Sequence, residues 1–145
     1  MSHQSRHNQP PRKDGDAARQ IIEISMNYYE SDKDGVLARQ VFHDWPRELS
    51  KIFGSQVKRT ALRKFYDRVV TARMLMRAKP NEKEKILRDT TGDIIRYAQY
   101  QEARRVISRD AREFLIKHAD YVDTNERRFE GFYQLFQSLM AYLPR

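Results

Sequence analysis

Apolar residues recur along most of this chain at spacings of three and four, which is the spacing of one face of an α-helix. Alternating runs of β-branched residues, the usual sign of a strand, are almost absent, and glycine is rare. The clearest helix lies near the C-terminus, where one continuous apolar stripe consists of Phe129, Phe132, Tyr133, Phe136, Met140 and Leu143. The pattern predicts an all-α protein.

The length of 145 residues favours one domain with a core of its own. We expect a compact bundle of about five to six helices over residues 16–145. Residues 1–15 are polar and contain two prolines, and we expect them to form a disordered basic tail.

Breaks in the apolar pattern place the boundaries of the first helices. We expect the first helix to be capped by Asp16, to carry its apolar face as far as Tyr29 and to stop at the sequence SDKDG. A second helical stretch should begin near Val36. We expect a break at Trp45-Pro46, because proline interrupts a helix, and then a short helix that Gly54 ends.

The second half of the chain is predicted to hold longer helices. A third helix should run over residues 57–78 and end at Lys79-Pro80, and a fourth should start near Asn81. Residues 90–92, Thr-Thr-Gly, could interrupt the fourth helix. The pattern leaves open whether residues 104–122 continue it or form a fifth helix.

The net charge of +8 is concentrated in one short segment. Residues 57–79 carry eight bases and one acid, a net charge of +7, whereas the remaining residues carry 20 bases and 19 acids, a net charge of +1. A localised positive field of this kind attracts polyanions such as nucleic acid or an acidic membrane surface.

On the predicted third helix the bases separate from the apolar side chains. The apolar stripe consists of Leu62, Phe65, Tyr66, Val69 and Met76, and the bases off it are Arg59, Arg63, Lys64, Arg68, Arg73 and Arg77. Pairs of these bases four residues apart repel by a few tenths of a kcal/mol each. A surface that served only solubility would interleave acids, so the pattern favours a polyanionic partner whose phosphates arginine contacts. The aromatic residues among the bases could stack on nucleotides, but their helical spacing favours packing in the core.

A weaker basic stripe lies in the sequence RRVISRDAR. Arg105, Arg109 and Arg112 fall on one face of a helix, while Val106 and Ile107 turn inward. Acids stand nearby at positions 110 and 113, so pairing within the helix accounts equally well for some of these arginines.

Motifs for catalysis or metal binding are incomplete. Residues 30–41 imitate the start of a calcium loop, but Val41 stands where a bidentate Glu is needed, so a solvated turn is favoured. The pair His43-Asp44 lacks further ligands, and His3 and His7 lie in the tail. No Gly-rich phosphate loop is present. We expect a non-enzyme without cofactor, metal or small-molecule substrate.

The cellular compartment is predicted from the residues and segments that the sequence lacks. It contains no cysteine, which is typical of a reducing, intracellular setting. No apolar run approaches the roughly 20 residues that a membrane span needs, and the N-terminus lacks the apolar segment of a signal peptide. We expect a soluble, cytoplasmic protein that is not bound to a membrane.

The segment VKRTALRKFYDRV, residues 57–69, resembles part of the small subunit of type III-A CRISPR effector complexes (the Csm complex). That part reads as an apolar residue, a short polar run and then Leu/Ile-Arg-Lys-Phe/Leu-Tyr. YQEAR at residues 100–104 is similar to the Tyr-x-x-x-Arg step of this family, and residues 129–143 are similar to its C-terminal aromatic helix with its Ala-Tyr pair. The resemblance therefore covers roughly residues 57–143.

The chain departs from the family pattern at a few positions. Ala61 stands where the family usually has Gln, and Lys58 and Arg59 stand where it has Thr or Ser. The two bases replace ordinary capping residues and strengthen the basic patch. Gln137 stands where an acid is common.

The resemblance implies a compact helical bundle with no active site. Several copies would stack along the inside of the ribonucleoprotein, beside the backbone subunits and beneath the large subunit, and would contact the paired crRNA and target RNA. Cleavage and signalling would belong to other subunits. From the charge pattern and the resemblance together, we expect RNA contacts from Lys58, Arg59, Arg63, Lys64, Arg68, Arg104, Arg105 and Arg109.

Three alternatives stay open at this point. The small subunit of the related type III-B complex is the rival within the same class. A helical DNA-binding regulator would use the basic helix as its recognition helix. An interaction protein would instead present its basic face to an acidic protein partner.

Overall fold

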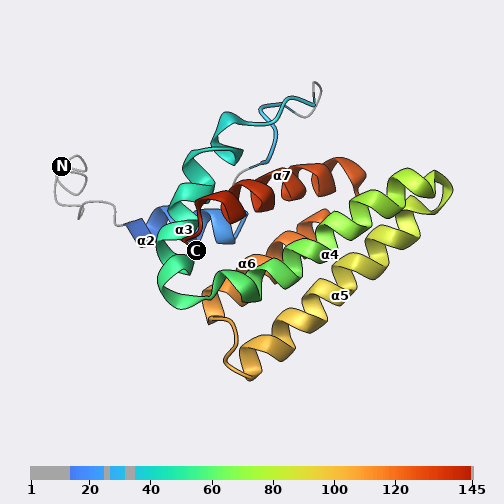
Figure 1. The fold of residues 1–145 in the computed structure, drawn as a ribbon. Coiled ribbons are helices and arrows are strands. Elements are labelled where there is room, and N and C mark those ends of the chain that lie inside the picture. Colours follow the sequence, from blue (N-terminus) through green and yellow to red (C-terminus); the bar gives the residue numbers. More distant parts are fainter. Residues whose placement is uncertain (1–13, 25–26, 32–34, 145) are drawn as a thin grey trace, which may run out of the picture.

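The computed structural model describes residues 14–24, 27–31 and 35–144. Within these ranges the chain forms six α-helices, two short 3-10 helices and one isolated β-bridge between Tyr29 and Leu37 (Figure 1). The helices are α2 (Asp14–Ile22), η1 (Arg39–Val41), α3 (Asp44–Gln56), α4 (Arg59–Ala78), η2 (Pro80–Glu82), α5 (Lys83–Ala103), α6 (Arg109–Val122) and α7 (Glu126–Tyr142). The all-α prediction is confirmed.

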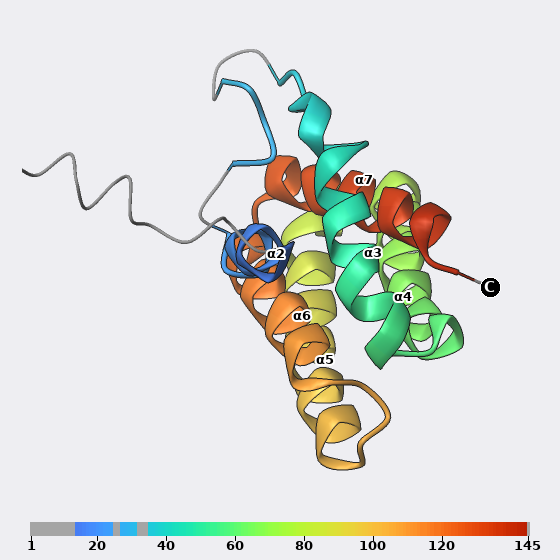
Figure 2. The ribbon, with the colours of Figure 1, turned by 90° about the vertical axis from the view of Figure 1, so that its left-hand side faces the viewer.

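The two longest helices form an antiparallel hairpin that sets the shape of the bundle. α4 lies between α5 and α7, and α6 returns along α5 (Figure 1). α3 packs on α7, and α2 lies against α3 and α6 (Figure 2). The α3–α4 corner and the α5–α6 corner therefore lie at the same end of the bundle, and the α4–α5 turn lies at the other.

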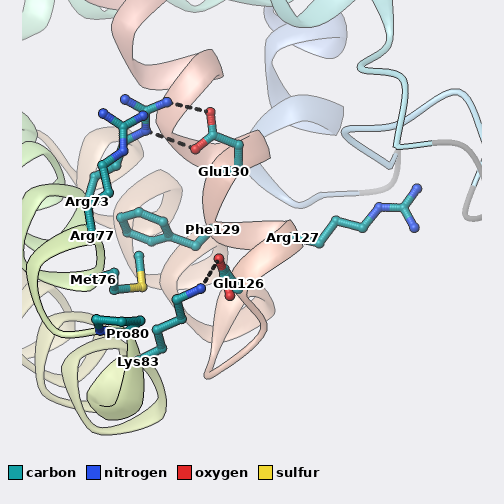
Figure 3. Close-up of a pocket in the computed structure, with 9 residues that line it drawn as sticks. All are labelled: Arg73, Met76, Arg77, Pro80, Lys83, Glu126, Arg127, Phe129 and Glu130. Carbon is teal, nitrogen blue, oxygen red and sulfur yellow. Dashed lines mark hydrogen bonds and ion pairs between the residues drawn. The ribbon is translucent and has the colours of Figure 1, made fainter.

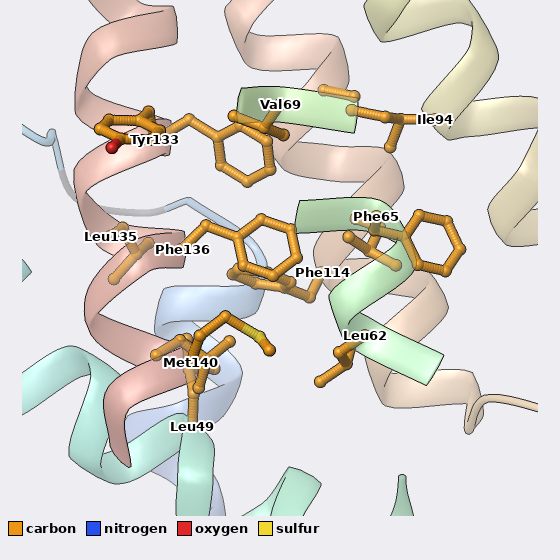
Figure 4. Close-up of a cluster of buried hydrophobic side chains, with 14 of the residues drawn as sticks. Leu49, Leu62, Phe65, Val69, Ile94, Phe114, Tyr133, Leu135, Phe136 and Met140 are labelled. Carbon is orange, nitrogen blue, oxygen red and sulfur yellow. The ribbon is translucent and has the colours of Figure 1, made fainter. Parts of the chain in front are cut away.

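The core is built from one apolar stripe on each long helix. Leu62 and Phe65 of α4 belong to the same buried cluster as Phe114 of α6 and Phe136 of α7 (Figure 4), and all four side chains are fully buried. The rings of Phe114 and Phe136 meet edge to face, with centroids 6.1 Å apart. The apolar stripe predicted for the last helix is buried at every position.

The predicted boundaries hold best in the second half of the chain. α4 ends at Ala78, directly before Lys79-Pro80 as expected. The Thr-Thr-Gly sequence at 90–92 does not interrupt α5, because the buried hydroxyl of Thr91 donates to the carbonyl oxygen of Leu87 at 2.8 Å. Residues 104–122 do not continue α5, and α6 is a separate helix.

The first half of the chain differs from the prediction. α2 begins at Asp14, before Asp16, and ends at Ile22, so its apolar face does not reach Tyr29. Tyr28 and Tyr29 follow in an extended segment that pairs with residues near Leu37, through a bond from the amide of Ala38 to the carbonyl of Tyr28 at 2.8 Å. The helix expected from Val36 is wrong, because these residues are the other arm of that pairing.

Pro46 and Gly54 lie inside α3, contrary to prediction. Pro46 occupies the first turn, where its missing N–H has no acceptor within the helix in any case. The helix continues past Gly54 to Gln56. The absent side chain of Gly54 makes room for Pro144, whose ring carbon Cδ would lie 3.1 Å from an added Cβ. Two expectations, those on the tail with His3 and His7 and on the acids of SDKDG, fall largely outside the described residues.

Tyr28 connects the N-terminal segment to the core. Its ring packs against Gly131 of α7, where an added Cβ would lie 2.6 Å from the Tyr28 Cβ. Its hydroxyl bonds Nδ1 of His118 in α6, and Nε2 of His118 bonds the carbonyl oxygen of Ile21 at 2.7 Å. Because a carbonyl only accepts, Nε2 carries the hydrogen and the Tyr28 hydroxyl donates to Nδ1.

Burial controls the protonation of this pair. His118 is almost fully buried, and desolvation lowers its pKa to about 3, so the ring is neutral in the folded protein. Burial also raises the pKa of Tyr28 well above its ordinary value, which keeps the donating hydroxyl protonated.

We predict that Gly131→Ala destabilises the protein by about 1 to 3 kcal/mol, because the new methyl group would displace the Tyr28 ring from a closely packed core. The measurement is the free energy of unfolding in urea. Gly92→Ala is the matched control: Gly92 lies inside α5 with nothing within 4 Å of an added Cβ, so this change should stabilise by up to about 1 kcal/mol. Equal effects of the two substitutions would contradict the packing argument.

We predict that stability falls as the pH drops below 6.5. His118 has a pKa of about 3 when folded and close to 6.5 when unfolded, so only the unfolded chain gains a proton between these values. Protonation of His118 in the unfolded chain should lower the free energy of unfolding by about 2 kcal/mol between pH 7 and pH 5. His118→Gln keeps a donor and an acceptor but does not titrate. Denaturation curves at both pH values should therefore show that the free energy of unfolding falls less in this variant than in the wild type, by about that amount. An unchanged pH dependence in this variant would show that another group is responsible.

Candidate nucleic-acid interface

The N-terminal end of α4 exposes a group of bases without partners. Lys58 is the N-cap residue, and Arg63 and Lys64 project from the first two turns into solvent. Among the described residues, no hydrogen bond or ion pair involves these three side chains. They are therefore available to an external anion.

Two other predicted site residues on α4 hold the fold together. The guanidinium of Arg59 donates from Nε and NH2 to the carbonyl oxygen of Met140, both at 3.3 Å, and so binds a free carbonyl at the C-terminal end of α7. Arg68 donates to Asp93 of α5 at 2.8 Å and lies 3.9 Å from the centroid of the Tyr97 ring. Both side chains connect α4 to a neighbouring helix.

Arg73 resembles Arg68 but connects α4 to α7. It contacts both carboxylate oxygens of Glu130, at 2.9 and 3.2 Å, and its guanidinium lies over the Tyr133 ring. Burial alone would raise the pKa of Glu130, but the bonds from Arg73 and Gln134 outweigh it and lower that pKa. The acids that the basic segment lacks are supplied by other helices, so the expected repulsion along α4 is confined to its N-terminal part.

The start of α4 differs from that of its neighbours. Of the α-helices from α3 to α7, which all lie within the described range 35–144, α4 alone has no acid in its first turn. α6 and α7 have side-chain caps, Ser108 and Asn125, whereas Lys58 makes no cap hydrogen bond. The positive end of the α4 dipole is therefore reinforced by bases and not neutralised, which favours a bound anion.

An open cleft lies beside this helix end. Its volume is about 580 Å³, and it is lined by Gly54, Ser55, Val57, Lys58, Arg59, Thr60 and Pro144. Hydroxyl groups and two bases thus surround the uncapped amides of α4, which is the chemistry that phosphate oxygens need.

The α5–α6 corner carries the second group of predicted bases. Arg104 ends α5, and Arg105 adopts a left-handed backbone conformation with φ of 61°. The amide of Arg105 bonds the carbonyl of Glu102 and the amide of Val106 bonds the carbonyl of Gln101, both at 2.9 Å. This is the Schellman motif, which usually has glycine at the left-handed position. The corner therefore holds Arg105 outward at a cost in backbone strain.

The predicted stripe of Arg105, Arg109 and Arg112 on one helix is wrong, because α6 begins only at Arg109. Arg109 is 79% exposed and lies 3.3 Å from Glu113 in the same helix, as the pairing alternative predicted. Arg112 instead points to Glu102 of α5, at 3.4 Å. Val106, expected inside, is partly exposed.

The acids of α6 also have a partner that the sequence did not suggest. Asp110 and Glu113 both accept from Arg19 of α2, each at 2.6 Å. These ion pairs attach α2 to α6, and Glu113 is shared between Arg19 and Arg109. Among the described residues, no acid forms an ion pair with Arg104 or Arg105.

Two larger clefts lie along α4. A groove of about 650 Å³ between α4 and α5 contains three bases and three acids: Lys64, Arg68, Arg96, Asp67, Asp89 and Asp93. A cleft of about 680 Å³ at the other end of α4 is lined by four bases and two acids, which include the ion pairs Arg73–Glu130 and Lys83–Glu126 (Figure 3). It includes none of the predicted site residues. Excess positive charge therefore lies toward both ends of α4, and the predicted site residues lie toward the end with the two corners.

Other kinds of site find no support in the part of the chain that the structure describes. No three His, Cys, Asp or Glu side chains lie together as metal ligands would. Nor do the described helices include one with the length and apolar character needed to cross a membrane.

Comparison with known families decides the class of protein. The family model Csm2 Type III-A matches residues 38–143. The chain belongs to the Csm2 family. It is a small subunit of a type III-A CRISPR effector complex, as the sequence resemblance indicated, and the match assigns it to type III-A and not type III-B. The matched region also includes α3, which the resemblance did not cover. No curated protein and no solved structure matched the chain.

We predict that Arg105→Gly stabilises this Csm2-family protein by about 1 kcal/mol, because glycine adopts the left-handed conformation without strain. Urea denaturation measures the change. Arg104→Gly is the matched control, since Arg104 has an ordinary φ of −86° and the same change there should not stabilise. Stabilisation by both substitutions would point to a general charge effect and not to backbone strain.

Proposed function

We propose that this chain is a non-catalytic subunit that binds the sugar-phosphate backbone of the crRNA and target RNA with one end of its bundle. The contacts come from Lys58, Arg63, Lys64, Arg104, Arg105 and Arg109. Arg59 and Arg68, which the sequence also suggested, add to the positive field while they hold α4 to α7 and α5. The protein acts in the cytoplasm beside the large and backbone subunits and further copies of itself.

The start of α4 is the observation that carries this proposal. Bases stand at a helix N-terminus, where they are unfavourable by about 0.3 to 1 kcal/mol each, and no acid or capping side chain offsets them. A bound polyanion would offset the unfavourable interaction of these bases with the helix dipole, and this relief would favour binding. Every other α-helix from α3 to α7, all within residues 35–144, has the acid that stability alone would favour.

Contact with phosphate suits a protein whose complex carries a guide RNA. Base pairing between guide and target supplies sequence recognition, so the subunit needs to recognise only charge and shape. Guanidinium and ammonium groups bind phosphate but stay protonated at neutral pH, so acid–base chemistry would fall to other subunits. A single copy offers few contacts, and stacking of several copies along the RNA would raise the overall affinity.

The packing of α4 argues against a DNA-reading regulator. A recognition helix must present a free face to the major groove. α4 lies between α5 and α7, which hold two of its bases, Arg68 and Arg73, and the exposed face of its second half carries the apolar side chains of Met74 and Leu75 (Figure 1).

We predict that Arg63→Glu combined with Lys64→Glu weakens target-RNA binding by the assembled complex roughly tenfold or more, because each lost contact is a hydrogen bond to a charged group. The slope of log K against log salt should become shallower by about 1.4, or about 0.7 per lost phosphate contact. Filter binding at several salt concentrations measures both quantities.

The matched control is Lys79→Glu combined with Lys85→Glu, which makes the same charge change at the opposite end of the α4–α5 hairpin. Both lysines are exposed, and this variant should retain most of its affinity and the wild-type salt slope. Equal losses in the two double variants would indicate a general effect of net charge. Unchanged affinity in the Arg63/Lys64 variant would exclude the proposed interface, and capture of an acidic protein without RNA would favour the interaction-protein alternative.

A further inference from the structure

The sequence YAQY in α5 contains two tyrosines in different surroundings. Tyr97 is half-buried: its ring centroid lies 4.9 Å from that of Phe65, Arg68 covers it, and its hydroxyl accepts from Gln101 at 2.9 Å. Tyr100 points outward and is 55% exposed. The Tyr97 ring packs against the core, whereas the Tyr100 ring does not.

Cationic side chains surround the exposed ring. Arg96 and Arg104 lie one turn before and one turn after Tyr100 on the same face of α5, and Arg105 follows at the corner. Arg104 donates to the Tyr100 hydroxyl at 3.4 Å, and its guanidinium carbon lies 5.2 Å from the ring centroid. The arginine therefore lies over one side of the ring, and the exposure of Tyr100 leaves ring surface open to a ligand.

The position of Tyr100 connects two parts of the positive end. Lys64 of α4 and Arg96 of α5 line the same groove, whose acids include Asp93, 3.2 Å from Arg96. The α5 stripe continues from Arg96 through Tyr100 to Arg104, beyond these acids. A nucleic-acid strand that follows these bases from α4 to the α5–α6 corner would cross the tyrosine. The Schellman motif fixes the backbone of Arg104 and Arg105, so the phosphate contacts and the ring have a defined relative placement.

We propose that Tyr100 stacks on an unpaired base of the bound RNA, while Arg104 and Arg105 contact the phosphates beside that base. Stacking needs an open base face, so the ligand is a nucleotide outside the paired stretch or one turned out of it, of any sequence. This inference rests on the proposed RNA-binding function and names the part of the RNA that the corner recognises. It also gives a role to an aromatic residue that the charge pattern did not single out.

The test uses the assembled complex and target RNAs in which single nucleotides are replaced, one at a time, by 2-aminopurine, whose fluorescence is quenched by stacking. Tyr100→Ala should weaken RNA binding roughly fivefold, the lower end of the effect of removing a ring that stacks on a base. It should also increase the fluorescence at one or a few positions. The salt slope should not change, because no charge is removed.

Two further variants separate stacking from other roles. Tyr100→Phe retains the ring but loses the hydroxyl bond to Arg104, and it should keep the affinity and the quenching. Phe42→Ala removes another exposed aromatic ring, 38% exposed, which lies between η1 and α3 and not on α5 or α6, and it should change neither quantity. Circular dichroism should show wild-type helicity in all three, since both side chains are exposed.

Each outcome supports or overturns the proposal. Wild-type affinity and quenching in Tyr100→Ala would overturn it, and if the Arg63/Lys64 charge reversal still weakens binding, the proposed function stands while the stacking role fails. If neither variant weakens binding, the proposed function itself fails. Loss of subunit copies from the complex with unchanged quenching would show that Tyr100 contacts a protein and would also overturn the inference.

Discussion

Burial of the α4 stripe is the constraint on which the rest of the structure depends. Leu62, Phe65 and Val69 are fully buried in the core, where α4 packs between α5 and α7, and this fixes the rotation of the helix about its axis. Once that rotation is set, Arg63 and Lys64 face solvent, whereas Arg68 and Arg73 reach the helices on either side. The same packing that forms the core therefore sorts the bases into those that bind protein and those open to a ligand.

The two classes of base have different energetic roles. Partly exposed ion pairs such as Arg68–Asp93 contribute about 1 kcal/mol or less, so they orient α4 more than they stabilise the protein. The unpaired bases at the start of α4 and the strained backbone at Arg105 act against stability. Unpaired like charges that lower stability without a structural role are typical of a functional surface, and here they lie at the end of the bundle that contains both corners.

The N-terminal segment packs against the region that the family model matches. The family match begins at residue 38, and α2 and the Tyr28 segment precede it. Arg19 attaches α2 to α6 through an ion pair, and the buried His118 of α6 bonds the carbonyl oxygen of Ile21. Tyr28 packs closely against Gly131 of α7. These contacts lie on the α6 and α7 side of the bundle, so the segment covers part of the core and leaves the start of α4 open.

The sequence by itself determined the helical class, the family, the bounds of α4 and the apolar stripe of α7, because these depend on local spacing over many turns and on contiguous motifs. It could not place the end of α2 or the extended Tyr28 segment, since these follow from contacts with Gly131 and His118, more than 80 residues away. Nor could it tell Arg63 from Arg68, because the acid that binds Arg68 comes from α5. Only the tertiary structure brings residues of distant helices together, and it alone decided which charges are paired and which tyrosine is exposed.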